Sequence, residues 1–384
     1  MTQKSGGMRI ALTGGGTGGH IYPALAVAAA IRRQWPDAEL LYLGSGAAME
    51  ARIVPQHGIA FQEIPARKLR KLVSLSTIAA AATMVRGTLV ARRYLRAFSV
   101  DAVLGTGGYV GAATVAAGAR LGAACTIIEG NVLAGRTNRW LARLTKAVCT
   151  AWDETSLQFR PGLAIRTGLP VRADVVLPAA VRPAAARLDL VQQLGAPPLA
   201  RNRFTVLALG GSQGSRGLNV PVCTAVPALL DEGCQVIHQT GEANLEAVRR
   251  AAAERGYLDS PWYLPTAWLS DISMASALRN ADLVVCRGGI STLSEVMANG
   301  RPALVVPLPT AYADHQRLNA EAFERAGGAV AMLESGLSGT SLAAAVCELA
   351  ASPGRHAAMC EASRRLSPIQ AADLAASIVM QSKP

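Results

Sequence analysis

The sequence predicts two α/β domains, each a doubly wound, Rossmann-like parallel sheet with helices on both faces. Short, nearly all-apolar runs alternate with helical patterns, which is typical of parallel strands that are buried on both sides. This alternation breaks off once, in a proline- and alanine-rich stretch, and then begins again. The chain of 384 residues is long for one core and comfortable for two, and its hydrophobic content of 51% is ample for burial.

The first domain is expected to contain strands at residues 9–13, 39–43, 60–64, 101–104 and 125–128, with a helix over residues 20–34 after the first strand. After the break at residues 178–203, the second domain restarts with strands at residues 204–209, 235–238, 283–286 and 303–306. We place the first domain at residues 8–175 and the second at residues 176–366. The C-terminal helix, residues 367–384, is expected to pack back on the first domain. Two such domains that face each other form a cleft, which is a usual place for a ligand.

Composition excludes several classes of protein. The seven cysteines are scattered, without C-x-x-C spacing, so neither a disulfide framework nor a zinc site is indicated. Residues 1–7 are polar and lead directly into a strand, so no signal peptide is visible. No apolar run reaches the ~20 residues of a membrane-spanning helix. The sequence therefore predicts a cytosolic protein.

The net charge of +12 is concentrated in one segment. Residues 64–100 hold no acidic residue and eight basic ones, which are Arg67, Lys68, Arg70, Lys71, Arg86, Arg92, Arg93 and Arg96. These bases flank an apolar stretch, residues 72–85, and this arrangement favours an anionic membrane surface over nucleic acid. The simpler interpretation is a solvated helix with a buried alanine face.

The first glycine-rich loop, residues 13–20, lies between a strand and a helix. Gly14, Gly16 and Gly19 match the dinucleotide fingerprint, but the second strand does not end in the acidic residue that a ribose requires. We therefore disfavour a nicotinamide enzyme and expect the loop to bind a phosphate or diphosphate at the helix N-terminus. His20 opens this helix, where a histidine either makes a structural hydrogen bond or removes a proton from an acceptor hydroxyl.

A second glycine-rich loop, residues 210–215, also follows an apolar strand. Further along, a buried strand runs into Gly288 and Gly289, and a helix starts near Ser291. The free N–H groups of this helix, with the hydroxyls of Ser291 and Thr292, are expected to hold a diphosphate. Glu295 lies on the same helix face and is placed to accept the hydroxyls of a ribose; the alternative is a helix-capping role.

Residues 313–319 combine Asp, His, Gln and Asn side chains after a strand that is closed by two prolines. Such side chains suit the recognition of sugar hydroxyls, and His315 and Asn319 are expected to make secondary sugar contacts. No Asp-x-Asp sequence occurs, so a metal clamp on a diphosphate is not supported and neither a metal nor a cofactor is expected. Together the motifs indicate a glycosyltransferase that uses a nucleotide-activated sugar.

Seven motifs, taken in order, resemble those of the MurG family of bacterial transferases. They are GGTGGH at residues 15–20, GTGGY at 105–109, TGLPVR at 167–172, GGSQG at 210–214, HQTG at 238–241, STLSE at 291–295 and DHQRLNA at 314–320. The resemblance covers nearly the whole chain. It implies the GT-B fold and an inverting transfer of N-acetylglucosamine from UDP-N-acetylglucosamine to lipid I, which gives lipid II for peptidoglycan synthesis.

The resemblance also implies roles for particular residues. The donor would be contacted by Thr17, Gly18, Gly19, Asn131, Arg172, Ser212, Ile290, Ser291, Thr292, Leu293, Ser294, Glu295 and Gln316. The acceptor's diphosphate would be held by Gly15, Gly16, Gly107, Gly108 and Tyr109. The acceptor's 4-hydroxyl would attack the anomeric carbon, with His20 as the base and UDP as the leaving group. The segment from Arg67 to Arg96 would dock on the cytoplasmic face of the plasma membrane, where the undecaprenyl-diphosphate-linked acceptor lies.

Three alternatives stay open. One is a related UDP-sugar transferase with another lipid acceptor, such as diacylglycerol. A second is a UDP-N-acetylglucosamine 2-epimerase, although its chemistry would need several carboxylates in the cleft and the first-domain loops contain none. The third is a non-enzymatic nucleotide-sugar sensor at the membrane, since Gly130 stands where the family usually has glutamine; Ala134 likewise replaces a usual proline.

Overall fold

The computed structural model describes residues 7–16, 18–46, 48–66, 75–176, 199–200, 202–211 and 214–382. Two of the expected site residues, Thr17 and Ser212, lie outside these ranges, as do the basic residues Arg67, Lys68, Arg70 and Lys71. The chain divides into two compact units. Unit 1 comprises Met1–Arg172 and Pro368–Pro384, and unit 2 comprises Ala173–Ser367.

Unit 1 is built on a seven-stranded parallel sheet with the strand order β3-β2-β1-β4-β5-β6-β7. Its strands are β1 (Arg9–Thr13), β2 (Glu39–Gly44), β3 (Ala60–Glu63), β4 (Ala102–Gly105), β5 (Ala124–Glu129), β6 (Ala147–Thr150) and β7 (Ala164–Arg166). Its helices are α1 (Gly18–Gln34), α2 (Ala48–Gln56), α3 (Leu75–Phe98), α4 (Gly108–Arg120), α5 (Arg136–Leu141), α6 (Asp153–Ser156) and α15 (Ala371–Gln381). The strands β4, β5 and β6 are buried along their whole length because helices cover both faces of the sheet.

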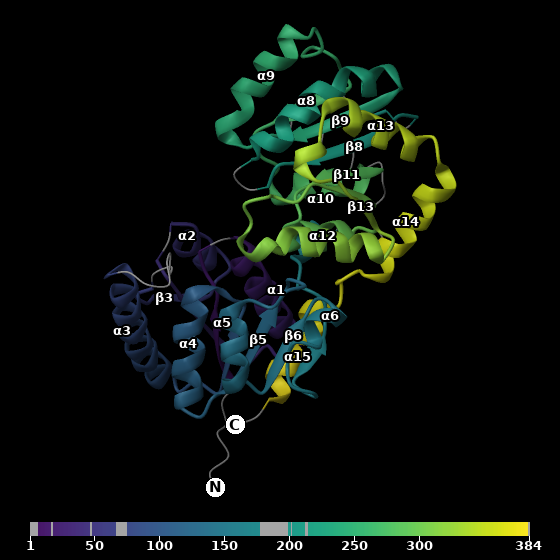
Figure 1. Ribbon diagram of the computed structural model, residues 1–384. Coiled ribbons are helices and arrows are strands. Elements are labelled where there is room, and N and C mark those ends of the chain that lie inside the picture. The colour runs from purple at the N-terminus through teal and green to yellow at the C-terminus, as the bar shows by residue number, and fades with distance from the viewer. Residues whose placement is uncertain are drawn as a thin grey trace. The chain divides into compact units, whose positions relative to one another are not determined.

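Small residues allow the helices of unit 1 to lie close to the sheet. A Cβ atom on Gly118 of α4 would come within 2.5 Å of the Val103 side chain on β4. Helix α4 packs against α3 and α5 on one face of the sheet (Figure 1). Helix α15 packs against α1, where Arg33 forms an ion pair with Asp373.

Unit 2 repeats this plan with a six-stranded parallel sheet in the order β10-β9-β8-β11-β12-β13. Its strands are β8 (Phe204–Leu209), β9 (Cys234–Gln239), β10 (Tyr263–Thr266), β11 (Leu283–Cys286), β12 (Ala303–Val305) and β13 (Ala329–Ala331). Its helices are α8 (Arg216–Asp231), α9 (Leu245–Glu254), α10 (Asp271–Asn280), α11 (Ile290–Ala298), α12 (His315–Arg325), α13 (Gly339–Ala350) and α14 (Pro353–Arg365).

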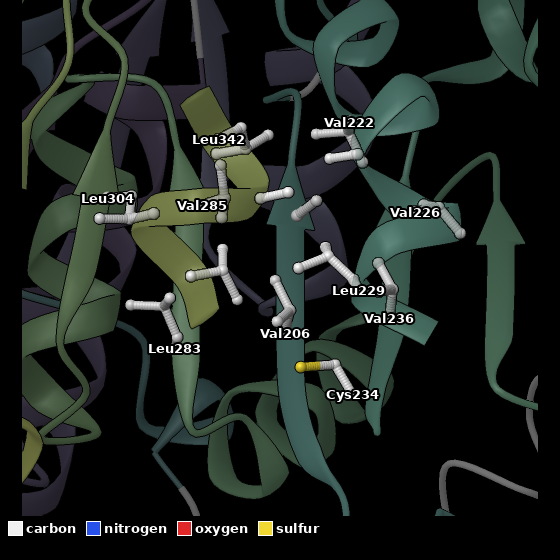
Figure 2. Packing of buried hydrophobic residues seen from close by; sticks show 14 of the residues in the cluster. Val206, Val222, Val226, Leu229, Cys234, Val236, Leu283, Val285, Leu304 and Leu342 are labelled. Atoms are coloured by element: carbon white, nitrogen blue, oxygen red, sulfur yellow. The ribbon is translucent and has the colours of Figure 1, made fainter. Parts of the chain in front are cut away.

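One hydrophobic core of unit 2 lies between a face of this sheet and the helices α8 and α13. Figure 2 shows Val206 of β8 and Val236 of β9 beside Val226 and Leu229 of α8. On the α13 side, Leu342 covers the neighbouring strand β11. These branched apolar side chains are the residues that a buried parallel sheet favours.

The nine strands that the sequence predicted are all present, each within one residue of its expected bounds at either end. The structure adds four strands that were not predicted, namely β6, β7, β10 and β13. Three of these, β7, β10 and β13, are edge strands, and β10 contains Pro265, which an edge strand tolerates.

Strand order reverses once in each sheet, between β1 and β4 in unit 1 and between β8 and β11 in unit 2. In doubly wound sheets, ligands bind at the carboxyl ends of the strands at such a point. The glycine-rich loops follow these four strands, so each unit has its own candidate site at the loops that follow its two central strands. Within the ranges that the structure describes, no helix is both long and apolar enough to cross a membrane.

Candidate functional site

The loops after β1 and β4 contact each other at the point in unit 1 where the strand order reverses. The hydroxyl of Thr106 donates to the backbone oxygen of His20 at 2.5 Å. Gly107 has a φ of +109°, and a Cβ atom there would lie 2.9 Å from the His20 ring. A Cβ atom on Gly108 would likewise lie 2.9 Å from the backbone oxygen of Gly15. Glycine is therefore required where the two loops meet.

His20 is half-buried in the first turn of α1, and its Nδ1 lies 2.9 Å from the backbone oxygen of Thr106. Because a carbonyl oxygen can only accept, Nδ1 carries the hydrogen, and Nε2 of the neutral ring is a proton acceptor. Burial lowers the pKa of His20 below its usual 6.5, although the bond to Thr106 and the charges of Glu129 and Glu50 oppose this. The imidazole is thus neutral at pH 7, the form that a general base needs.

A buried carboxylate lies behind the first glycine-rich loop. Glu50 of α2 is 0% exposed, and its Oε1 accepts from the N–H of Gly16 at 2.5 Å. Its Oε2 accepts from the N–H of Ser45 at 2.7 Å. From the neighbouring strand β2, the Tyr42 hydroxyl donates to the backbone oxygen of Gly14 in this loop. The loop is therefore fixed from β2 and α2, and the N–H of Gly16 is engaged inside the protein.

Tyr109 and Arg172 lie around the N-terminus of α1. Gly16 has a φ of +86°, and a Cβ atom there would lie 3.4 Å from the Tyr109 ring. The Arg172 guanidinium lies over the ring of Tyr22, 4.2 Å from its centroid, a cation–π contact. A Cβ atom on Gly18 would come within 3.1 Å of that same ring. The structure thus brings these predicted site residues together within unit 1.

A second buried carboxylate orients Asn131. Glu129 ends β5, and its Oε1 accepts from the backbone N–H and the side-chain amide of Asn131, at 3.0 and 3.2 Å. Its Oε2 accepts from the N–H of Gly135 at 2.8 Å. The indole of Trp152 donates to the backbone oxygen of Gly130 at 3.1 Å. The turn after β5 is therefore closed by groups of unit 1, despite the glycine at position 130.

In unit 2, a buried arginine ties the loops after β8 and β11 together. Arg287 follows β11 and is 7% exposed. Its Nε donates to the Ser215 hydroxyl at 2.9 Å, and its Nη1 donates to the backbone oxygen of Val306 at 3.2 Å. It also forms an ion pair with Glu334 at 2.6 Å. Since Glu334 compensates its charge, Arg287 is suited to holding the loops rather than to binding an anion alone.

Some side chains of helix α11 are buried and others are accessible to solvent. Leu293 and Ser294 are buried. The side chains partly open to solvent are those of Ile290, Ser291, Thr292 and Glu295. Because α11 begins at Ile290, Glu295 lies in the second turn, beyond the first-turn positions where an acid serves a helix N-terminus. The capping alternative for Glu295 is therefore weak.

The predicted residues of α12 differ in accessibility. Asn319 is 0% exposed, and its amide donates to the backbone oxygen of Gly288 at 3.1 Å. It therefore supports the turn between β11 and α11 from the protein interior. The side-chain oxygen of Gln316 accepts from the N–H of Leu308 at 3.0 Å. Gln316 and His315 are half-buried, and they are the accessible members of the set.

Three buried charged residues beside these loops, Glu50, Glu129 and Arg287, were not predicted from the sequence. Glu129 and Arg287 lie at the carboxyl ends of buried strands, and this position is a signal that could have found them. Glu50 has no such signal, because it lies in a helix 34 residues after Gly16. In the part of the chain that the structure describes, no group of three or more His, Cys, Asp or Glu side chains could hold a metal ion.

Family models match both units. The N-terminal domain of glycosyltransferase family 28 matches residues 10–150, and the C-terminal domain of that family matches residues 205–376. The matched segments contain the loops after β1, β4, β8 and β11 described above.

Curated relatives match nearly the full chain under one name, UDP-N-acetylglucosamine–N-acetylmuramyl-(pentapeptide) pyrophosphoryl-undecaprenol N-acetylglucosamine transferase. The relative from Desulforudis audaxviator is 38% identical over 95% of this chain and 96% of its own length. The relative from Geobacter sulfurreducens is 34% identical over 95% of this chain and 96% of its own length.

Solved structures share the fold. MurG of Acinetobacter baumannii superposes with a TM-score of 0.74 at 27% identity, covering 97% of this chain and 99% of its own. A putative UDP-N-acetylglucosamine 2-epimerase from Listeria monocytogenes gives 0.69 at 16% identity, over 97% and 96% of the two chains, which shows a common fold alone. With both domain models matched in order and full-length relatives above 30% identity, the chain belongs to glycosyltransferase family 28, in its MurG group of N-acetylglucosamine transferases with the GT-B fold.

Proposed function

We propose that the protein transfers N-acetylglucosamine from UDP-N-acetylglucosamine to the N-acetylmuramyl-pentapeptide of an undecaprenyl-diphosphate-linked acceptor. This reaction converts lipid I into lipid II for peptidoglycan synthesis. The names of the full-length relatives describe such a transfer. The structural observation that carries the proposal is His20, whose Nε2 is a proton acceptor among the glycine-rich loops of unit 1.

The reaction needs one proton transfer and one displacement. Nε2 of His20 takes the proton from the acceptor's 4-hydroxyl while that oxygen bonds to the anomeric carbon. The bond from this carbon to the β-phosphate oxygen breaks, and UDP leaves with the electron pair. Attack opposite the leaving group inverts the anomeric configuration.

Unit 2 holds the donor in this proposal. The first N–H groups of α11 and the hydroxyls of Ser291 and Thr292 bind its diphosphate, helped by the positive end of the helix dipole. The carboxylate of Glu295 accepts from the ribose hydroxyls, and Gln316 and His315 face the sugar. Ser212, Asn131 and Arg172 complete the donor contacts that the family pattern implies.

Unit 1 holds the acceptor, with the diphosphate near the loops of Gly15, Gly16, Gly107, Gly108 and Tyr109. The N–H of Gly16 is already engaged by Glu50. We therefore assign anion binding mainly to the first turn of α1, where Gly18 and Gly19 precede His20. These groups also lie nearest to the transferred sugar in the proposal.

The deciding experiment incubates the purified protein with UDP-N-acetylglucosamine and a lipid I analogue. Release of UDP together with a disaccharide-lipid is the expected result, measured by a coupled UDP assay and mass spectrometry. Parallel reactions contain diacylglycerol in place of the lipid I analogue, or no acceptor. Glycosylated diacylglycerol without disaccharide-lipid would exclude the peptidoglycan assignment, and a 2-epimerised sugar, free or still bound to UDP, would indicate an epimerase.

We also propose that α3 docks the protein on the cytoplasmic face of the plasma membrane as a peripheral protein. Val85 and Leu89 are 61% and 60% exposed on this helix. Arg92, Arg93 and Arg96 are exposed on the following turns, and they line a hollow of about 460 Å³ together with Leu89 and Ala97. Apolar side chains next to a basic cluster suit an anionic lipid surface.

The double substitution Arg92→Gln/Arg93→Gln is expected to weaken binding to vesicles that contain phosphatidylglycerol. Each basic residue near such a surface contributes about 1 kcal/mol, so two account for a roughly 30-fold loss. Vesicle co-sedimentation measures the effect. The matched control, Arg249→Gln/Arg250→Gln on the exposed face of α9, removes the same charge from unit 2 and should bind like the wild type. Equal loss in both variants would mean that net charge, and not α3, attracts the membrane.

A further inference from the structure

Glu50 is a fully buried carboxylate to which the proposed mechanism gives no role. A buried carboxylate is costly unless its oxygens accept several hydrogen bonds. Oε1 of Glu50 accepts from the N–H of Gly16 at 2.5 Å and from the hydroxyl of Ser45 at 3.0 Å, and Oε2 accepts from the N–H of Ser45 at 2.7 Å. The side chain therefore joins the glycine-rich loop after β1 to the loop after β2.

The geometry requires a carboxylate at this position. The two backbone N–H groups, of Gly16 and Ser45, meet different oxygens, so an amide in the same place could satisfy only one of them. The carboxylate is closely packed, because a Cβ atom on Gly15 would lie 2.3 Å from Oε1 and one on Gly44 would lie 2.6 Å from Oε2. Moving this side chain would therefore move the loop.

The position of this loop matters for His20, which opens the helix that the loop leads into. The Tyr42 hydroxyl from β2 holds the Gly14 end of the loop, and Glu50 from α2 holds its Gly16 end. Helix α1 then starts two residues later, at Gly18. A shift of about 1 Å in a catalytic group can cost ~10²-fold in rate, so the anchoring of this loop is a functional requirement.

The charge of Glu50 acts on His20 as well. The charged groups that favour protonated His20 are Glu129 of β5 and Glu50 of α2. Of the other titratable groups nearby, Tyr109 of α4 lies against Gly16 and Tyr42 of β2 against Gly14, and Arg172 is stacked on Tyr22 of α1. A negative charge behind the loop stabilises the imidazolium that forms when the base accepts a proton.

We propose that Glu50 is a positioning residue for the transfer: it fixes the turn at residues 14–16 so that His20 meets the acceptor's hydroxyl, and its charge stabilises His20 after the proton has moved. The proposal deepens, and rests on, the function proposed above.

The test compares the purified wild-type protein with Glu50→Gln, Glu50→Asp and Glu39→Gln. Transfer to the lipid I analogue is measured with each substrate varied, across a pH series that spans the histidine range. Glu50→Gln should lower kcat/KM for the acceptor roughly 10- to 100-fold, leave KM for the donor unchanged, and move the acidic limb of the pH profile to lower pH. Glu39→Gln removes the same charge from the opposite end of β2, where Glu39 is exposed, and should superpose on the wild type.

Glu50→Asp separates position from charge. The shorter side chain keeps the charge, so the acidic limb should stay at the wild-type pH while kcat/KM for the acceptor still falls. If Glu50→Gln does not fold, Glu50→Asp alone tests the proposal. Because Glu50→Asp retains the charge, a shift of its acidic limb away from the wild-type pH would overturn the proposal. Glu50→Gln with wild-type Tm, wild-type kcat/KM for the acceptor and a wild-type pH profile would also overturn it. A wild-type protein that makes no disaccharide-lipid contradicts the proposed function instead, whatever the Glu50 variants show.

Discussion

Substitution of His20 by alanine is expected to lower kcat for transfer to the lipid I analogue about 10²- to 10⁴-fold, the range of a lost general base. The neutral ring presents Nε2 as the proton acceptor because Nδ1 donates to the Thr106 oxygen at 2.9 Å. Affinity for UDP should stay at the wild-type value, since the nucleotide is assigned to unit 2. Steady-state assays give kcat, and isothermal titration calorimetry gives the UDP affinity.

The matched control is His57→Ala, which removes an exposed histidine of unit 1 after α2 and should leave kcat unchanged. The wild-type pH profile adds a second check. Burial lowers the pKa of His20 from 6.5, so kcat/KM for the acceptor should remain flat through neutral pH and fall only as the pH drops below the ordinary histidine range. Near-normal kcat in His20→Ala would assign a structural role to the Thr106 bond and require another base.

The central strands of both sheets could be predicted because their sequences contain strong local signals. The prediction matched β1, β8 and β11 at both ends, since each is a largely apolar run that is followed by a polar or glycine-rich turn. The three missed edge strands, β7, β10 and β13, lack this contrast, whereas β6 is a buried inner strand of only four residues. Strand β13 has three residues, and β7 at the other sheet's edge exposes Ile165 by 43%. Edge pairing depends on a neighbour that is distant in sequence, which a local pattern cannot indicate.

The candidate site, like the fold, could be predicted from the sequence only in part. The glycine-rich loops and the helix face of Ser291, Thr292 and Glu295 follow from spacing, and the structure places these side chains where they are accessible. The bond between Glu50 and Gly16 and the burial of Asn319 could not be predicted, because each depends on a contact across 31 or more residues. Polar residues in a motif can support a loop from beneath or face a ligand, and only tertiary structure distinguishes the two.

Substitution of Glu295 by alanine is expected to weaken UDP binding by about 1.5–3 kcal/mol, the contribution of a charge-assisted hydrogen-bonding group, which corresponds to roughly 10- to 150-fold. Its side chain lies on the accessible face of α11, three residues after Thr292 and four after Ser291, so one ligand can meet all three. Calorimetric titration with UDP measures the change. Titration with uridine tests the assignment to the ribose, because the loss should persist without the diphosphate.

The control for Glu295→Ala is Glu246→Ala, which removes an exposed acid from the first turn of α9 in the same unit. It should leave UDP affinity unchanged. The two possible roles of Glu295 predict opposite results. A ribose-binding carboxylate loses affinity with little change in Tm, because its hydroxyl partners belong to the ligand. If Glu295 only stabilises the helix, its substitution lowers Tm while UDP binds normally. That outcome would remove Glu295 from the donor site.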